Sequence, residues 1–115
     1  MTRVLMIDQD RVTTQALGLA CLEREVGMVF ADNVCEGIRV LLETHVDLVV
    51  IDAAALRLTP RELATLFERV APEVPVTVVV RPEALDARVA LEVAGFRVLT
   101  RPVTAEDLLD KVVSV

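Results

Sequence analysis

Four short apolar segments recur along the chain at similar intervals. They are rich in β-branched residues and do not alternate with polar ones: residues 4–7 (VLMI), 48–51 (LVVI), 76–80 (VTVVV) and 98–100 (VLT). Strands that are covered by helices on both faces have this composition. The pattern predicts four central parallel strands, and a weaker segment, residues 27–31 (GMVFA), predicts a fifth strand at one edge.

Helical spacing fills the stretches between these segments. The predicted helices cover residues 11–25, 34–43, a stretch that opens with Thr59-Pro60-Arg61-Glu62, residues 83–94, and a last stretch that opens at Thr104. Five alternations of strand and helix predict an α/β fold: a doubly wound, five-stranded parallel sheet with five helices and right-handed crossovers. Five strands in a chain of 115 residues fit the flavodoxin-like order 2-1-3-4-5.

Length and hydropathy predict a single domain that spans residues 1–115. Apolar residues make up 54% of the chain, but no apolar run approaches the length of a membrane span. The N-terminus has no secretory leader pattern, which favours a cytoplasmic location. We therefore expect a protein with no membrane association.

The charge and the cysteines narrow the function classes. A net charge of −6 and the lack of Trp and Tyr argue against direct nucleic-acid binding. Cys21 and Cys35 have neither CxxC spacing nor a histidine or acid that would complete a metal set. Both lie in helical patterns among apolar residues, so we expect both to be reduced core residues.

A charged residue follows each of the four central strands. These are Asp8, Asp52, Arg81 and Arg101, and the carboxyl ends of parallel strands share one edge of the sheet. In the order 2-1-3-4-5, Asp8 and Asp52 follow neighbouring strands. At a separation of about 6 Å and an effective dielectric constant of about 20, their repulsion is roughly 3 kcal/mol. A positive group is therefore expected beside them, either a divalent cation or a guanidinium.

This order of elements resembles the CheY-like receiver domain of two-component response regulators. The resemblance spans the whole chain, from RVLMID at the start to TAEDLLDKV at the end. It implies that Asp52 occupies the phosphoacceptor position, that Asp8 is the first member of an acid pair, and that both are Mg²⁺ ligands. Pro102 matches the proline of the family's Lys-Pro element and is a candidate for a cis peptide bond.

Several positions depart from the family pattern. Gln9 replaces the second acid of the pair, and Asp10 is not an evident substitute for it, since an acid is common at that third position. Val80 stands at the switch Thr or Ser position, Val98 stands near the switch aromatic, and Arg101 replaces the lysine. Losing one carboxylate weakens Mg²⁺ binding by about 2–4 kcal/mol, a factor of about 30 or more.

These departures predict an atypical pseudo-receiver that acts by protein contact, with no cofactor or only weakly bound Mg²⁺ and with weak or no phosphorylation at Asp52. The alternative is a conventional Mg²⁺-dependent receiver that a histidine kinase phosphorylates on Asp52. A remote alternative is a flavodoxin-like cofactor binder, which the glycine-free loop after the first strand disfavours. We therefore expect a signalling domain rather than an enzyme.

The resemblance also implies protein partners. These are a histidine kinase, a phosphotransfer protein or an output domain. In receiver folds, the fourth helix, fifth strand and fifth helix often mediate dimerisation. The predicted helix at 83–94 carries Leu85, Val89, Leu91 and Val93 around much of its circumference. This pattern indicates either an interface, such as a homodimer through that face, or deeper burial of the helix.

Overall fold

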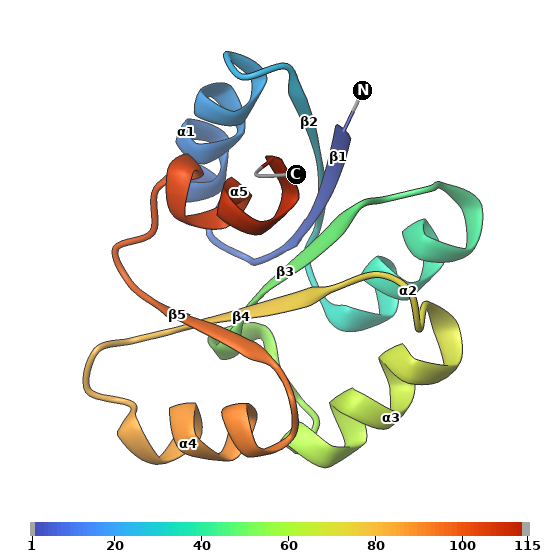
Figure 1. The fold of residues 1–115 in the computed structure, drawn as a ribbon, viewed down its shortest axis with the longest axis vertical. Coiled ribbons are helices and arrows are strands. Elements are labelled where there is room, and N and C mark those ends of the chain that lie inside the picture. Colours follow the sequence, from blue (N-terminus) through green and yellow to red (C-terminus); the bar gives the residue numbers. More distant parts are fainter. Residues whose placement is uncertain (1, 114–115) are drawn as a thin grey trace.

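The computed structural model describes residues 2–113, and side chains as far as residue 110, as one parallel sheet with helices on both faces (Figure 1). The strand order is β2-β1-β3-β4-β5, which confirms the predicted doubly wound, flavodoxin-like architecture with five helices. The strands are β1 (Thr2–Ile7), β2 (Val26–Ala31), β3 (Leu48–Asp52), β4 (Val76–Val80) and β5 (Arg97–Thr100). The helices are α1 (Arg11–Leu22), α2 (Val34–Glu43), α3 (Pro60–Val70), α4 (Leu85–Val93) and α5 (Ala105–Val113), with a short 3₁₀ turn at Ala53–Ala55.

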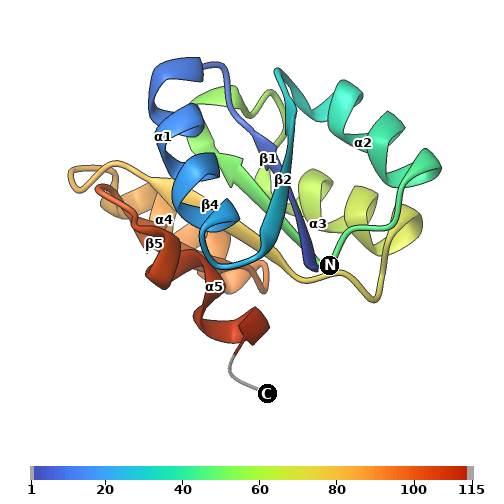
Figure 2. The same cartoon turned by 90° about the horizontal axis from the view of Figure 1, so that it is seen from above.

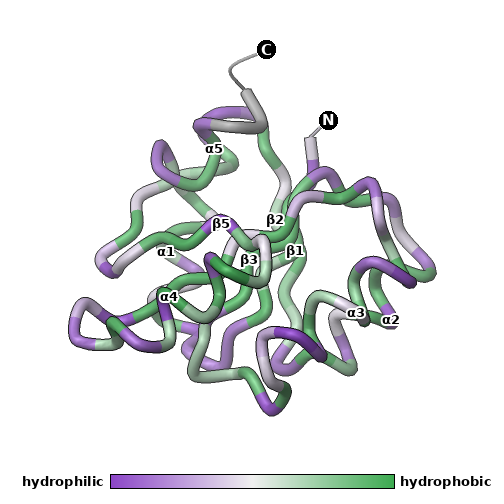
Figure 3. Tube along the Cα trace, turned by 60° about the horizontal axis from the view of Figure 1, so that its bottom comes forward, coloured by the Kyte–Doolittle hydropathy of each residue, from purple (hydrophilic) through white to green (hydrophobic). Residues whose placement is uncertain are grey.

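The helices form two layers. α1 and α5 lie together over one face of the sheet, and α2, α3 and α4 cover the other (Figures 1 and 2). The strands between the layers are the most apolar part of the trace (Figure 3). β1, β3 and β4 supply fully buried residues to both layers, as their unalternating sequences predict.

Local capping signals mark the helix starts. Thr59 and Glu62 form a complete capping box at α3, and Pro60 is its first residue. Thr104 and Asp107 exchange the same pair of hydrogen bonds at the start of α5, each at 3.1 Å. These capping contacts confirm the predicted starts of α3 and α5.

Two sequence expectations were wrong. The first helix ends at Leu22 rather than at residue 25, because the chain turns there and Glu25 adopts a left-handed φ of 61°. Cys35 is exposed, whereas Cys21 is buried. Val34 already faces the core, and each residue of a helix is rotated by about 100° from the one before, so the next side chain points to solvent.

In the described residues, no helix is both long enough and apolar enough to span a membrane.

Candidate functional site

The strand ends bring charged residues to one edge of the sheet. Asp8 directly follows β1, Asp52 is the last residue of β3, and Arg101 directly follows β5. All five strands are parallel, and β1 and β3 are neighbours at the point where the strand order reverses. Ligand sites in doubly wound sheets lie at this position.

Arg101 bridges the two acids. Its Nη2 donates a hydrogen bond to Asp8 Oδ2 at 3.2 Å and forms an ion pair with Asp52 Oδ2. The Asp8 and Asp52 side chains are only 6% and 9% exposed, and that of Arg101 is 29% exposed. A guanidinium suits this place because it is less strongly hydrated than an ammonium and donates in several directions. It offsets the repulsion between two nearly buried carboxylates.

Backbone donors occupy the remaining carboxylate oxygens. The Asp10 N–H donates to Asp8 Oδ1 at 2.9 Å, and the Ala54 N–H donates to Asp52 Oδ1 at 2.8 Å. Every oxygen of the two carboxylates therefore has a donor. A cation with oxygen ligands would have to displace the guanidinium from both acids before it could bind between them.

The donor set does not fit a resident divalent cation. Two carboxylates face the bridge, and Gln9, at the position of a third ligand, is exposed and neutral. Among the described residues, no three acidic, histidine or cysteine side chains are grouped to hold a metal. Arg101 supplies the positive charge between the two acids.

Asp10 caps helix α1 and is not one of the two acids that Arg101 contacts. It is exposed and caps α1, accepting hydrogen bonds from the Thr13 N–H at 3.3 Å and from the Thr13 hydroxyl at 2.7 Å. These bonds, the hydroxyl bond first, hold the pKa of Asp10 below its usual value of 3.8, and the charge of Arg101 adds a smaller effect in the same direction. The acid is held in its ionised form at a helix N-terminus.

The remaining predicted site residues lie around the bridge. Val80 is the last residue of β4 and is buried, and its carbonyl accepts from the Arg101 N–H at 2.9 Å. Val98 is half-buried and packs in the core beneath α2, α3 and α4. Arg81 is exposed and forms no ion pair within the described part of the chain. The Arg101–Pro102 peptide bond is cis.

Sequence reasoning missed a second ion pair at the same edge. Arg11 forms an ion pair with Asp32, and its guanidinium lies 5.5 Å from the centroid of the Phe30 ring. Asp32 follows β2, and β2 pairs with β1. Looking for charged residues after the edge strand, as was done for the central strands, would therefore have found Asp32.

A contact on the other side of the site was also missed. Arg88 of α4 donates to the Thr100 hydroxyl at 3.4 Å and to Glu92 at 3.2 Å. Thr100 is the register partner of Val80, so the hydroxyl at this level of the sheet belongs to β5 instead of β4. Only the strand register shows that Thr100 lies beside Val80, because these two residues are 20 positions apart in the chain.

The strand order, the acids after β1 and in the last position of β3, and the base after β5 define the class: the fold is that of the CheY-like receiver domains of response regulators. No protein-family model matches the chain. Over 106 residues the chain is 30% identical to the transcriptional regulatory proteins GlrR of Escherichia coli K12 and QseF of Escherichia coli O157:H7. The match covers 91% of this chain but only 24% of either relative, so the chain spans about a quarter of their length.

Solved receiver domains share the fold. A response regulator receiver domain from Clostridium thermocellum is 24% identical, with a TM-score of 0.77 over 94% of this chain and 88% of that one. The beryllofluoride-activated NtrC4 receiver domain dimer is 20% identical, with a TM-score of 0.82 over 96% and 93% of the two chains. A Burkholderia pseudomallei response regulator with a phosphorylated aspartic acid and a calcium ion has a TM-score of 0.80 at 17% identity, over 95% and 65%. These likenesses establish the CheY-like fold.

Proposed function

We propose that residues 1–115 act as one receiver-like domain of a response regulator in cytoplasmic two-component signalling. The CheY-like fold, the acids at positions 8 and 52, and the similarity to two transcriptional regulators support this function. The domain would transmit a signal by contact with other proteins rather than act as an enzyme. Its partners would be a histidine kinase, a phosphotransfer protein or an output domain.

The finer proposal is a pseudo-receiver in which Arg101 replaces the metal. One observation carries it: a single guanidinium nitrogen contacts both carboxylates, whose other oxygens accept backbone hydrogen bonds. An incoming phosphoryl group would need Asp52 freed from Arg101. It would also meet a site one carboxylate short of the usual metal ligand set. Phosphorylation at Asp52 would be weak or absent.

Val80 supports the same proposal, because it would weaken the conformational response to phosphorylation. A ligand shifts a two-state equilibrium only by the contacts that differ between the states. Val80 has no hydroxyl with which to pull its loop toward a phosphoryl oxygen, a bond worth about 1.5–3 kcal/mol to a charged group. The nearest hydroxyl in the register, on Thr100, is already bonded to Arg88.

A conventional Mg²⁺-dependent receiver is the second candidate. The observation in its favour is that Asp8 and Asp52 meet at the strand-order reversal, within reach of one shared positive group. If Arg101 swung outward, the two acids would be left together with the Gln9 amide. A metal titration separates the two candidates.

A contact surface on α4 would suit either candidate. Leu85, Val89 and Val93 lie four residues apart on one side of the helix and are 65%, 60% and 83% exposed, while Leu91 faces the core at 1%. This stripe is a candidate homodimer surface together with β5 and α5.

The deciding experiment is an Mg²⁺ titration, with and without beryllofluoride, that follows the amide chemical shifts of residues 8–10 and 52–54. We expect the wild type to show no saturation into the millimolar range. Gln9→Asp combined with Arg101→Lys restores a carboxylate and frees the bridge, so we expect affinity to rise by about 30-fold or more. Arg81→Lys, a matched change at an exposed arginine, should behave like the wild type.

Saturable binding to the wild type at millimolar Mg²⁺ or below, with shifts confined to these two segments, would overturn the pseudo-receiver in favour of the conventional receiver. If the double variant also fails to bind, the site departs further from a receiver than two residues explain, and the role of Arg101 as a metal substitute is wrong.

A further inference from the structure

β2 is an edge strand that lacks the usual protection of such an edge. It pairs with β1 on one side, and no strand of the described chain lies on the other. Its sequence, VGMVFA, holds no charge and no proline over six residues. Natural edge strands are commonly short or carry charges, proline or a bulge, because an open edge invites pairing. The opposite edge, β5, is four residues long and begins with Arg97.

The outward-facing backbone groups of β2 follow from its pairing with β1. The Ala31 carbonyl accepts from the Asp8 N–H at 3.0 Å, so the backbone of Ala31 points toward β1. This direction alternates along a strand. The N–H and C=O groups of Val26, Met28 and Phe30 therefore face away from the sheet, where a further strand could bond them.

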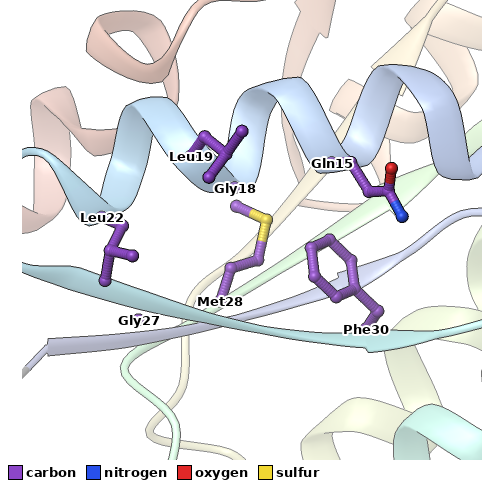
Figure 4. Close-up of a pocket in the computed structure, with 7 residues that line it drawn as sticks. All are labelled: Gln15, Gly18, Leu19, Leu22, Gly27, Met28 and Phe30. Atoms are coloured by element: carbon purple, nitrogen blue, oxygen red, sulfur yellow. The ribbon is translucent and has the colours of Figure 1, made fainter.

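An apolar groove of about 460 Å³ runs beside this edge, between α1 and β2 (Figure 4). Leu19 and Leu22, which are 65% and 55% exposed, form its wall on α1. Met28 and Phe30 point from β2 toward the helix (Figure 4). Gly18 allows the close approach, since a Cβ there would lie 3.0 Å from the Phe30 ring. The edge thus combines open backbone groups with an apolar wall.

We infer that this edge is a self-association site, at which two copies of the chain pair their β2 strands antiparallel about a twofold axis through Met28. In this register Met28 faces Met28 of the second copy and Val26 faces Phe30, while Arg24, in the turn before β2, lies at the same end of the strand pair as Asp32 of the second copy. The outward-facing residues then form the directly bonded pairs of an antiparallel ladder. Two five-stranded sheets become one continuous sheet.

Charges near the two ends of β2 give an antiparallel second copy an opposite-charge contact at each end, beside the exposed Glu23 and Glu25 that flank Arg24. Arg24 lies just before β2 and Asp32 just after it, and both are exposed. Antiparallel pairing places each Arg24 beside an Asp32 that already contacts Arg11 in its own copy, and the twofold axis makes this happen at both ends. A parallel pairing of the same strands would put like charges together.

The apolar contacts are self-complementary as well. Phe30 opposite Val26 is an aromatic and β-branched pair, a favourable cross-strand combination. The two α1 helices would approach across the axis, and each would cover the exposed Leu19 and Leu22 of the other. This interface includes neither the contacts of Arg101 with Asp8 and Asp52 nor the exposed stripe on α4. It therefore does not depend on whether Asp52 is phosphorylated.

Sedimentation equilibrium over a concentration series tests the proposal, with Leu19→Glu and Val89→Glu as matched changes at exposed apolar positions on α1 and α4. We expect the wild type to associate and Leu19→Glu to lose about tenfold or more of that association, whereas Val89→Glu, which removes only the candidate α4 contact, should keep a concentration-dependent dimer. A monomer at every concentration would overturn the inference, as would a dimer that only Val89→Glu dissociates.

A charge-swap mixture tests the register. Arg24→Asp alone and Asp32→Lys alone each place two like-charged pairs in their own dimer, so each should associate about tenfold more weakly. An equimolar mixture places an opposite pair at both ends and should form a heterodimer close to wild-type affinity. A mixture no tighter than either variant would contradict the antiparallel register.

Amide hydrogen exchange gives a readout that does not depend on substitution. The Met28 and Phe30 amides should gain protection as the wild-type concentration rises, while the Val29 amide, which faces β1, should not change. Equal exchange of the Met28 and Phe30 amides at low and high concentration would rule out strand pairing.

Discussion

At the scale of single residues, the contacts of Arg101 with the two acids depend on the shape of its guanidinium. One nitrogen of Arg101 contacts Asp8 and Asp52 together, and the Arg101 N–H is fixed to the end of β4 through Val80. Lysine carries one compact ammonium on a flexible stem, which is more strongly hydrated and less suited to fixing two partners. In the pseudo-receiver that we propose, the departure from lysine is what would allow a protein group to take the place of a metal.

Removal of this guanidinium should expose the repulsion that it offsets. Arg101→Ala leaves two nearly buried carboxylates without their cation, so we expect the free energy of unfolding to fall by about 2–3 kcal/mol, allowing for the partial exposure of Arg101. Urea unfolding measures this loss. Mg²⁺ should recover part of it in the variant, because the freed oxygens can then bind a cation.

Arg81→Ala is the control for this prediction. Arg81 also follows a strand but is exposed, so its removal should change stability by no more than about 0.5 kcal/mol. Equal losses in the two variants would mean that Arg101 contributes no more than a surface charge does.

The sequence predicted the site residues that follow central strands and missed those that depend on side-chain direction. Asp8, Asp52 and Arg101 meet because parallel strands end at one edge, which strand order alone implies. The exposure of Cys35 depends on which side of α2 faces the sheet, and an apolar neighbourhood in the sequence does not determine that side. The contact between Arg88 and Thr100 needed the relative placement of α4 and β5.

At the scale of elements, the strands were predicted well because burial on both faces leaves a clear composition. The helix ends were predicted where a side chain caps them, as at Thr59 and Thr104. The end of α1 was missed because no glycine or proline marks it: Leu22 is followed by Glu23, Arg24 and Glu25. A non-glycine residue at positive φ leaves no such signal in the sequence.

The capping box of α3 should contribute measurably to stability. In Thr59→Ala the Glu62 N–H loses its side-chain acceptor, so we expect a loss of about 1 kcal/mol in thermal or urea unfolding. Thr65→Ala is the matched control, because Thr65 is exposed in the same helix and its hydroxyl only bonds back to the Arg61 carbonyl. A loss in Thr65→Ala as large as that in Thr59→Ala would show that the cap is not the cause.

The packing of α2 on β1 requires a glycine. A Cβ at Gly37 would lie 2.4 Å from Cδ1 of Ile7, which is fully buried. Gly37→Ala should therefore destabilise the protein by about 1–2 kcal/mol, although alanine favours a helix by up to about 1 kcal/mol.

A double-mutant cycle identifies this clash as the cause. Ile7→Val removes the nearest atom and costs about 1 kcal/mol by itself. In the double variant Gly37→Ala with Ile7→Val, the total loss should be smaller than the sum of the two single losses. Simple additivity in urea unfolding would show that helix α2 shifts to avoid Ile7.

At the scale of the whole molecule, three carboxyl groups predict how stability responds to acid. A hydrogen bond from the Thr13 hydroxyl lowers the pKa of Asp10, one from the Arg3 N–H lowers that of Asp47, and one from the Thr59 N–H lowers that of Glu62. Each folded pKa lies below the unfolded value, so the stabilisation is fully present above that value and is lost as pH falls through the folded pKa.

The unfolding free energy should therefore not depend on these groups near neutral pH and should decline from about pH 4.5 downward, where the usual pKa values of 4.5 for Glu and 3.8 for Asp begin to matter. Urea unfolding at a series of pH values measures the slope. Glu62→Gln can keep the bond to the Thr59 N–H without a titrating group, so its decline should be shallower than that of the wild type. Identical slopes would show that the capping box is not linked to protonation, since the neutral amide and the carboxylate would then support α3 equally at every pH.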